Sequence, residues 1–185
     1  MCKILKTKSY IPFDCKRSIF DIDYNKLYEN GRKIVLFDLD NTIIPYDVVK
    51  PNEQILQLFN NIKRIGLKVV LISNNKRPRV EMFSREADLD FISSAKKPFK
   101  SGYKRLLKKY KYTNPSEVIT IGDQLMTDVL GARRMGFDCI LVKAIKKKTE
   151  KWYTRFNRRL ENRVLNKMKR IDNATYNKIK ELEEN

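Results

Sequence analysis

Short apolar runs, separated by amphipathic stretches, dominate the first 143 residues of the chain. Four runs rich in Val, Ile and Leu have the length of buried strands: residues 34–39, 67–73, 117–122 and 137–143. Continuous rather than alternating apolar character is typical of parallel strands, because both faces of a parallel sheet are covered. A shorter stretch at 90–93 predicts one further strand.

Apolar residues at helical spacing fill the segments between these runs. The pattern predicts helices over residues 52–65, 78–87, 101–110 and 127–135, the last of them closed by Gly136. Strands that alternate with helices predict an α/β fold, a three-layer Rossmann-like parallel sheet, because each parallel connection crosses over one face. In such sheets a ligand binds beyond the carboxyl ends of the strands.

Two flanking regions differ from this alternating core, which we place at residues 31–145. Residues 1–30 carry scattered apolar anchors and predict a lead-in that packs on the core. Residues 146–185 predict a basic, amphipathic helical extension.

The extension is the most strongly basic part of the chain. From Lys143 to Arg170 it carries 12 Lys or Arg residues and only 2 Glu. Apolar residues recur at helical spacing: Trp152, Phe156, Leu160, Val164, Met168 and Ile171. Such a helix suits peripheral contact with an anionic membrane through residues 146–171, packing of its stripe on the domain, or, as the least favoured choice, RNA binding.

The charge balance and the missing residue types narrow the chemistry. A formal net charge of +18 favours an anionic partner, such as a phosphorylated substrate, an anionic lipid surface or nucleic acid, or else reflects solvated lysines. The chain has no histidine, which excludes Ser-His-Asp triads and His-ligated zinc sites. Its three cysteines form no CxxC pair, and no run has the apolar length of a signal peptide or membrane span. These features predict a cytoplasmic protein.

Acidic residues follow two of the predicted strands. Asp38 and Asp40 stand in the segment DLDNT, and Asp123 and Asp128 stand in GDQLMTD. Alternation along a strand would place Asp38 and Asp40 on the same side of the chain. Clustered carboxylates favour Mg²⁺, which binds through one or two carboxylates together with substrate phosphate. An EF-hand and a P-loop are excluded, because the residues that their loops require are missing.

Two further segments complete the set of polar strand ends. Ser73 ends a strand, where its hydroxyl and the following N–H groups, including that of Asn74, suit phosphate oxygens or simply form a helix-capping turn. Lys97 precedes Pro98, which favours an extended backbone, so its ammonium suits the neutralisation of phosphate charge. Lys97 alone would be indistinguishable from a solvated lysine. The order Asp-x-Asp, Ser, Lys, Asp…Asp favours the functional interpretation.

With these four motifs, DLDNT, Ser73 in ISNN, Lys97 in KKP and GDQLMTD, the sequence resembles the haloacid dehalogenase (HAD) superfamily of phosphatases. It is most similar to the YqeG-type subclass IIIA, a group that includes the mitochondrial phosphatidylglycerophosphate phosphatases. The segment SIFDIDYNKLYENGRK before the first motif and RFNRRLENRV in the tail fit this resemblance. The likeness covers about residues 10–170.

The resemblance implies a role for each motif residue. Asp38 would be the nucleophile that forms an aspartyl-phosphate, and Asp40 the general acid and then base. The Mg²⁺ ligands would come from Asp38, Asp40 (through its backbone carbonyl) and Asp123, and Asp128 would complete the metal shell or position Lys97. The phosphate-binding residues would be Thr42, Ser73, Asn74 and Lys97.

The spacing of the motifs also bears on the substrate. Residues 43–72 and 74–96 separate the motifs where these enzymes carry a cap domain, and each has room for only one helix and one strand. We therefore expect no cap domain and an open site. The resemblance, the open site and the basic tail together predict hydrolysis of phosphatidylglycerophosphate at the inner face of the membrane. The alternatives are an RNA- or ribosome-assembly-associated binding protein with secondary phosphatase activity, and a phosphatase of a soluble phosphorylated metabolite.

Overall fold

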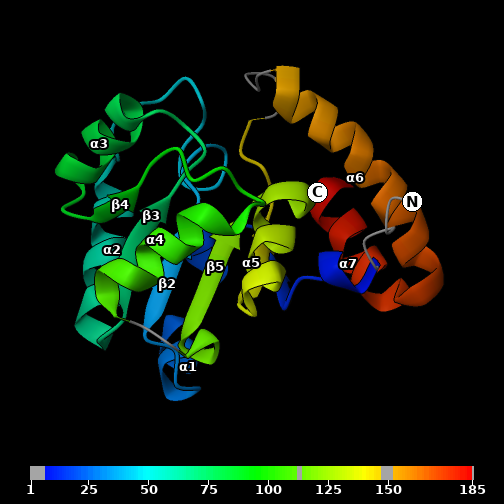
Figure 1. The fold of residues 1–185 in the computed structure, drawn as a ribbon, viewed down its shortest axis with the longest axis horizontal. Coiled ribbons are helices and arrows are strands. Elements are labelled where there is room, and N and C mark those ends of the chain that lie inside the picture. Colours follow the sequence, from blue (N-terminus) through cyan, green and yellow to red (C-terminus); the bar gives the residue numbers. More distant parts are fainter. Residues whose placement is uncertain (1–6, 112–113, 147–151, 185) are drawn as a thin grey trace.

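A six-stranded parallel sheet forms the centre of the molecule in the computed structural model, which describes residues 7–111, 114–146 and 152–184 (Figure 1). The strand order is β1-β6-β5-β2-β3-β4. The strands are β1 Asp14–Lys16, β2 Ile34–Phe37, β3 Lys68–Ile72, β4 Asp90–Ile92, β5 Val118–Gly122 and β6 Asp138–Val142. The predicted α/β fold is confirmed.

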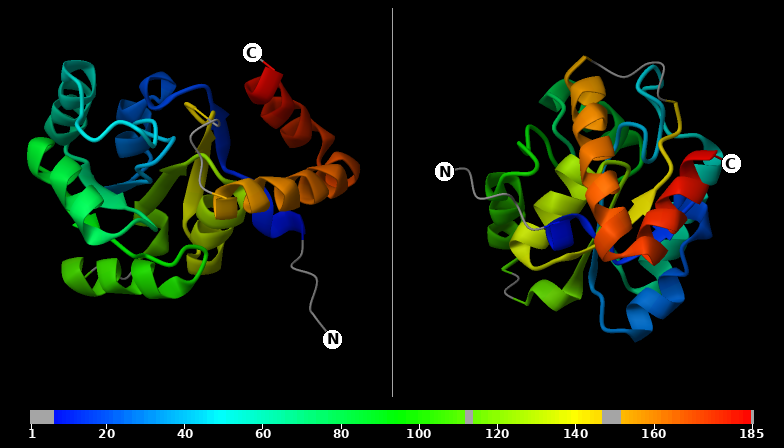
Figure 2. Two further views of the ribbon diagram at one scale, coloured as in Figure 1. Left: turned by 90° about the horizontal axis from the view of Figure 1, so that it is seen from above. Right: turned by 90° about the vertical axis from the view of Figure 1, so that its right-hand side faces the viewer.

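Helices cover both faces of this sheet and give a three-layer arrangement (Figures 1 and 2). One face packs against α1 and α2 and α3, and the other against α4, α5, α6 and α7. The helices are α1 Tyr24–Glu29, α2 Glu53–Ile65, α3 Arg77–Glu86, α4 Lys100–Tyr110, α5 Leu130–Met135, α6 Trp152–Ile171 and α7 Asn173–Glu184. Short helical turns are η1 Thr7–Tyr10, η2 Ile19–Asp21, η3 Pro115–Glu117 and the π-helical turn η4 Leu125–Val129. Residues 43–72 and 74–96 supply α2 with β3 and α3 with β4.

Strand β2 shows why the central strands are apolar throughout. All four of its side chains are fully buried. Val35 and Phe37 belong to the core on one face of the sheet, and Ile34 and Leu36 to the core on the other. Because β2 pairs in register with both β3 and β5, its carboxyl end lies between theirs. The polar residues that follow these strands therefore meet at one edge.

The N-terminal segment contributes a strand that the apolar pattern did not predict. Strand β1 pairs with β6 at the edge of the sheet. Among the expected apolar anchors of this segment, Ile19, Ile22 and Leu27 are buried, whereas Phe20 and Tyr28 are exposed. The segment therefore packs on the core, and it also extends the sheet.

The C-terminal helices pack on the domain through α6 and α7. Leu165 and Met168 of α6 and Ile179 of α7 are buried in the core on the α4–α5 side of the sheet. Ile171, the last residue of the predicted stripe, is exposed. The stripe also included Trp152 and Phe156, whose side chains lie outside the described residues. The buried face of α6 thus includes Met168, which belongs to the predicted stripe, and Leu165, which does not. This part of the helix packs on the domain.

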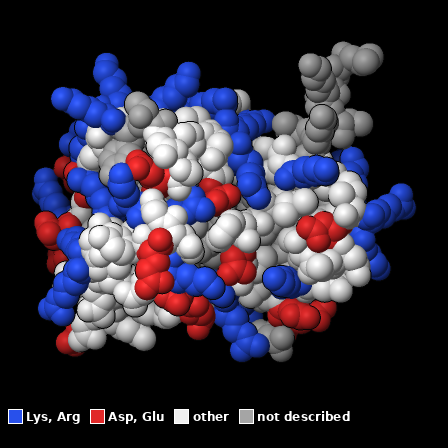
Figure 3. All heavy atoms as spheres, turned by 90° about the horizontal axis from the view of Figure 1, so that it is seen from below, with Lys and Arg blue, Asp and Glu red and all other residues white. Residues whose placement is uncertain are grey.

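Charged side chains of both signs share the face at the amino ends of the strands, which Figure 3 shows from below. Ion pairs join neighbouring elements there, including Arg32 with Asp138 at 2.5 Å and Lys33 with Glu117 at 2.5 Å. Part of the basic excess is therefore locally neutralised at the end of the sheet opposite the motifs. No helix among the described residues has the length and apolarity needed to cross a lipid bilayer.

Candidate active site

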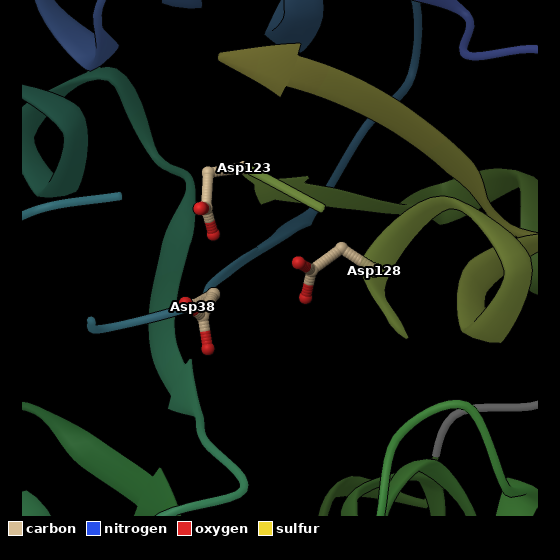
Figure 4. A group of neighbouring side chains, drawn as sticks. All are labelled: Asp38, Asp123 and Asp128. Carbon is tan, nitrogen blue, oxygen red and sulfur yellow. The ribbon is translucent and has the colours of Figure 1, made fainter. Parts of the chain in front are cut away.

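Three buried aspartates converge at the carboxyl ends of β2 and β5. Asp38 follows β2, Asp123 follows β5, and Asp128 lies in η4. Figure 4 shows the three side chains next to one another, and one carboxylate oxygen from each lies within 4.8 Å of the others. Each of the three residues is no more than 7% exposed. The adjacency of β2 and β5 is what brings the two acidic motifs together.

The ammonium of Lys97 lies between two of these carboxylates. Its Nζ atom is 2.6 Å from Asp38 Oδ1 and 2.6 Å from Asp128 Oδ1. Burial opposes the charged form of Lys97, but the carboxylates of Asp128 and Asp38 overcome this and raise its pKa. The lysine is therefore a fixed positive charge at the site rather than a solvated side chain.

The charges of the cluster fit a divalent cation. Three carboxylates face a single ammonium, which leaves an excess of negative charge in a buried place. Burial raises the pKa of Asp38 well above its ordinary value, the nearby Lys97 lowers it, and the Asp128 and Asp123 carboxylates raise it further. A cation held by the three carboxylates would offset their repulsion and keep Asp38 ionised. Oxygen-only donors of this kind suit Mg²⁺.

The turn that carries Asp128 is fixed from several directions. Its Oδ2 atom accepts hydrogen bonds from the Gln124 N–H at 3.1 Å and from the Thr127 hydroxyl at 3.2 Å. Gly122 makes room for this side chain, because a Cβ atom at Gly122 would lie 2.3 Å from Asp128 Cγ. The sequence placed Asp128 in the first turn of a helix, and the structure places it in a π-helical turn that precedes α5.

Thr42 lies beneath the carboxylates rather than in the open pocket. It is 2% exposed, and its hydroxyl is 3.4 Å from Asp38 Oδ2 and 3.3 Å from Asp123 Oδ1. The hydroxyl can donate to one of these oxygens at a time. The hydroxyl therefore contacts two of the carboxylates, and the direct contact of Thr42 with phosphate that the sequence predicted stays a prediction.

Ser73 and Asn74 shape the loop on the β3 side of the pocket. The Ser73 hydroxyl oxygen accepts the Asn75 N–H at 3.0 Å. This is a local turn and not the helix cap considered from the sequence, because α3 begins after Lys76 and has no side-chain cap. The side chain of Asn74 pairs with the backbone of Lys97 in both directions, donating to its oxygen at 3.0 Å and accepting from its N–H at 2.6 Å. Asn74 thereby holds the loop that carries the lysine, while the hydroxyl proton of Ser73 remains available to the pocket.

Asp40 stands apart from the aspartate cluster. Strand β2 ends at Phe37, and Asn41 adopts a left-handed φ of 64°, so simple alternation does not continue through the motif. Asp40 Oδ1 instead accepts from Arg79 Nε at 2.7 Å, and Oδ2 accepts from Asn75 Nδ2 at 3.1 Å. Its carboxylate still lines the same pocket as Asp38.

The pocket contains residues that sequence reasoning did not single out. It is lined by Asp38, Asp40, Asn41, Tyr46, Ser73, Asn74, Asn75, Lys97, Gln124, Thr127 and Asn157. Tyr46 accepts from Asn75 Nδ2 at 2.9 Å and lies under the Arg79 guanidinium, which is 4.9 Å from its ring centre. In a chain with 40 Lys and Arg residues, nothing in the sequence distinguishes Arg79 from its neighbours.

Comparisons with known proteins agree with this geometry. Residues 16–136 match the family profile described as "haloacid dehalogenase-like hydrolase". A Bacillus subtilis (strain 168) protein named "Probable phosphatase YqeG" is 36% identical over 163 residues, which span 88% of this chain and 94% of that protein. The crystal structure of an uncharacterized protein from Listeria monocytogenes serotype 4b shares the fold, with a TM-score of 0.52 and 16% identity over 64% of this chain and 85% of that one. The chain therefore belongs to the haloacid dehalogenase-like hydrolase family.

Proposed function

We propose that this hydrolase is a Mg²⁺-dependent phosphomonoesterase that acts through an aspartyl-phosphate on Asp38. The observation that carries the proposal is the buried arrangement of Lys97 between Asp38 and Asp128, with Asp123 beside them. A carboxylate attacks an anionic phosphate only where nearby positive charge offsets the repulsion. The relative named "Probable phosphatase YqeG" supports the same reaction class.

The reaction proceeds in two displacements at phosphorus. An oxygen of Asp38 attacks the phosphorus, the bond to the leaving oxygen breaks, and Asp40 gives its proton to that oxygen. Asp40 then takes a proton from water, whose oxygen attacks the phosphorus and displaces Asp38 as inorganic phosphate is released. Ser73 and Lys97 hold the phosphoryl oxygens through both steps, and Arg79 and Asn75 hold Asp40 at the pocket wall.

The metal requirement follows from the same carboxylates. Asp38, Asp123 and Asp128, with the backbone carbonyl of Asp40, would hold Mg²⁺. When bound, Mg²⁺ supplies charge neutralisation for the attacking carboxylate and for the phosphate. Thr42 keeps two of the three carboxylates in position.

For the substrate we propose phosphatidylglycerophosphate, which the cytoplasmic enzyme would meet at the inner face of the membrane. Exposed apolar side chains of the loops that follow β2 and β6 support contact with a membrane: Val48, Val49 and Ile145. The two loops are joined by Lys146 and Asp47 at 2.5 Å, and Ile145 N donates to the Asn41 oxygen at 3.0 Å, next to the pocket. Exposed apolar loop tips on a chain with a net charge of +18 suit an anionic lipid surface.

The test is phosphate release with Mg²⁺ from phosphatidylglycerophosphate in mixed micelles and from a panel of soluble phosphomonoesters. Asp38→Asn serves as the blank, because it removes the nucleophile and one charge of a repelling cluster. We expect it to lose about 10⁴-fold or more in kcat and to keep the fold. A folded Asp38→Asn protein with appreciable turnover would contradict the mechanism. Equal rates on lipid and soluble esters would remove the lipid substrate and leave the reaction class standing.

A further inference from the structure

The C-terminal helix α6 reaches the catalytic pocket. Asn157 lines the same pocket as Asp38, Asp40 and Lys97 and is half-buried. Helix α6 also contacts η4, the turn that carries Asp128. Figure 2 shows α6 running beside α5 and past the strand ends. A segment far from the four motifs in the sequence therefore contributes to the wall of the site.

A buried carboxylate fixes the position of this helix. Glu161 lies one helical turn after Asn157 and is 6% exposed. Its Oε1 atom accepts the Met126 N–H at 3.2 Å, within η4. Leu165 and Met168 continue the same side of the helix into the core. Because this line of residues anchors α6, Asn157 has a set place relative to the pocket.

We propose that α6 forms a substrate-selecting wall of the active site, with Asn157 as its specificity-determining residue and Glu161 as the residue that positions the wall. The inference rests on the proposed phosphatase function. The phosphoryl group is held by groups at the strand ends, such as Asp38, Ser73 and Lys97. The organic part of the ester extends away from them, so a residue contributed by α6 limits its size rather than the binding of phosphate itself.

The test measures binding of two inert ligands, methylphosphonate and 1-naphthylmethylphosphonate, by calorimetry to the full chain with Mg²⁺. In Asn157→Trp we expect the ratio of the naphthylmethyl Kd to the methyl Kd to rise at least tenfold. Asn166→Trp is the matched control, because Asn166 is exposed on the same helix. It should leave the ratio within about twofold of the wild-type value. Equal weakening of both ligands by Asn157→Trp, or the same ratio change in Asn166→Trp, would overturn the proposal.

The role of Glu161 is tested by combining its variants with Asn157→Trp. Glu161→Gln keeps a carbonyl acceptor for the Met126 N–H, whereas Glu161→Ala removes it. In the Glu161→Ala background the helix can shift away from the pocket. Asn157→Trp should then raise the ratio of the naphthylmethyl Kd to the methyl Kd by less than about threefold. In the Glu161→Gln background the full rise of this ratio should persist. An unchanged rise in both backgrounds contradicts the positioning role.

Turnover of phosphatidylglycerophosphate in mixed micelles and of 1-naphthyl phosphate by the same wild-type preparations separates the two proposals. Absence of turnover rejects the phosphatase function, while the phosphonate ratios still decide whether α6 selects ligands. Failure of the wild-type protein to bind either phosphonate overturns the selecting wall as well.

Discussion

At the scale of single residues, the site is built from charges that only partly cancel. Lys97 contacts Asp38 and Asp128, and Asp123 adds a third buried carboxylate. Such a cluster is stable only when every member is held by its surroundings, as Asp128 is by Gln124 N–H and Thr127. Small displacements at this point should therefore alter catalysis more than they alter folding.

Gly122→Ala tests this sensitivity. The new Cβ would lie 2.3 Å from Asp128 Cγ, so the carboxylate has to leave the position in which it pairs with Lys97. We expect kcat/KM to fall by about 100-fold, as is typical of a displacement of about 1 Å. Gly31→Ala is the control. Gly31 has a φ of +78° with open space around it, so alanine should cost about 1 kcal/mol of stability through backbone strain. Equal kcat/KM in the two variants, measured beside their unfolding midpoints, would argue against the steric account.

The sequence was sufficient to predict some site residues and insufficient for others. Asp38, Ser73 and Asp123 directly follow apolar strands, so their place depends on the sheet alone. Lys97 lies in a loop five residues after β4, and its place depends also on the Asn74 side chain that holds this loop. The direction of the Asp40 side chain depends instead on the left-handed turn at Asn41 and on its partners Asn75 and Arg79, which no apolar pattern encodes. The same holds for Thr42, whose hydroxyl faces the carboxylates.

At the scale of the elements, the central strands were predictable and the edges were not. Strands β2 and β5 are buried throughout, and continuous burial leaves a continuous apolar run. Strand β1 has the sequence Asp-Cys-Lys and is half-buried at the edge, so it resembles a loop in composition. Its pairing is decided by β6, far along the chain.

The opposite edge strand, β4, is tied to its neighbours by Asp90. This carboxylate lies 2.5 Å from Lys109 Nζ, accepts from the Tyr110 hydroxyl at 2.6 Å, and pairs with Lys68 at 3.4 Å. Burial opposes its ionisation, but the hydrogen bonds from Lys109 and Tyr110 lower the pKa of Asp90 to about 2. An aspartate in an unfolded chain titrates near about 4.

Asp90→Asn should therefore lower stability by about 1 kcal/mol at pH 7, a figure reduced for the partial solvent exposure of the pair. A lowered folded pKa gives stability that is fully present above pH of about 4 and is lost as the pH falls toward about 2. Urea unfolding of wild type and Asp90→Asn at pH 7 and at pH 3 measures the difference. A difference in the free energy of unfolding that is larger at pH 3 than at pH 7 would contradict the lowered pKa of Asp90.

At the scale of the whole molecule, the basic extension has one face buried in the core of the domain and another face exposed to solvent. Leu165, Met168 and Ile179 are core residues, so deletion of residues 149–185 would expose the α4–α5 side of the sheet. Loss of activity after such a deletion would not separate membrane contact from unfolding. The exposed face of α6 offers a test that leaves the core intact.

Changing the exposed α6 set to glutamine should weaken binding to anionic vesicles by about 100-fold or more, since each basic residue near such a surface contributes about 1 kcal/mol. This set is Arg159, Arg163, Lys167 and Arg170. A control set on α4 and its C-cap residue has the same spacing in the sequence and the same charge and is also exposed: Lys100, Lys104, Lys108 and Lys111. Vesicle sedimentation measures the affinity of each variant, and the changes on α4 should weaken vesicle binding by less than about threefold. Equal losses would mean that net charge alone, and no particular face, determines binding.

The pairing of β1 with β6 also bears on how the chain is made. During synthesis Asp14 leaves the ribosome early, whereas its partner Ile140 emerges only after most of the domain has been translated. Helix α7, which contacts β1, follows later still. The nascent N-terminal segment therefore waits without its native partner while β2, β3 and β5 can already assemble. Its polar composition, Asp-Cys-Lys, keeps this waiting edge strand from offering an apolar surface to other chains.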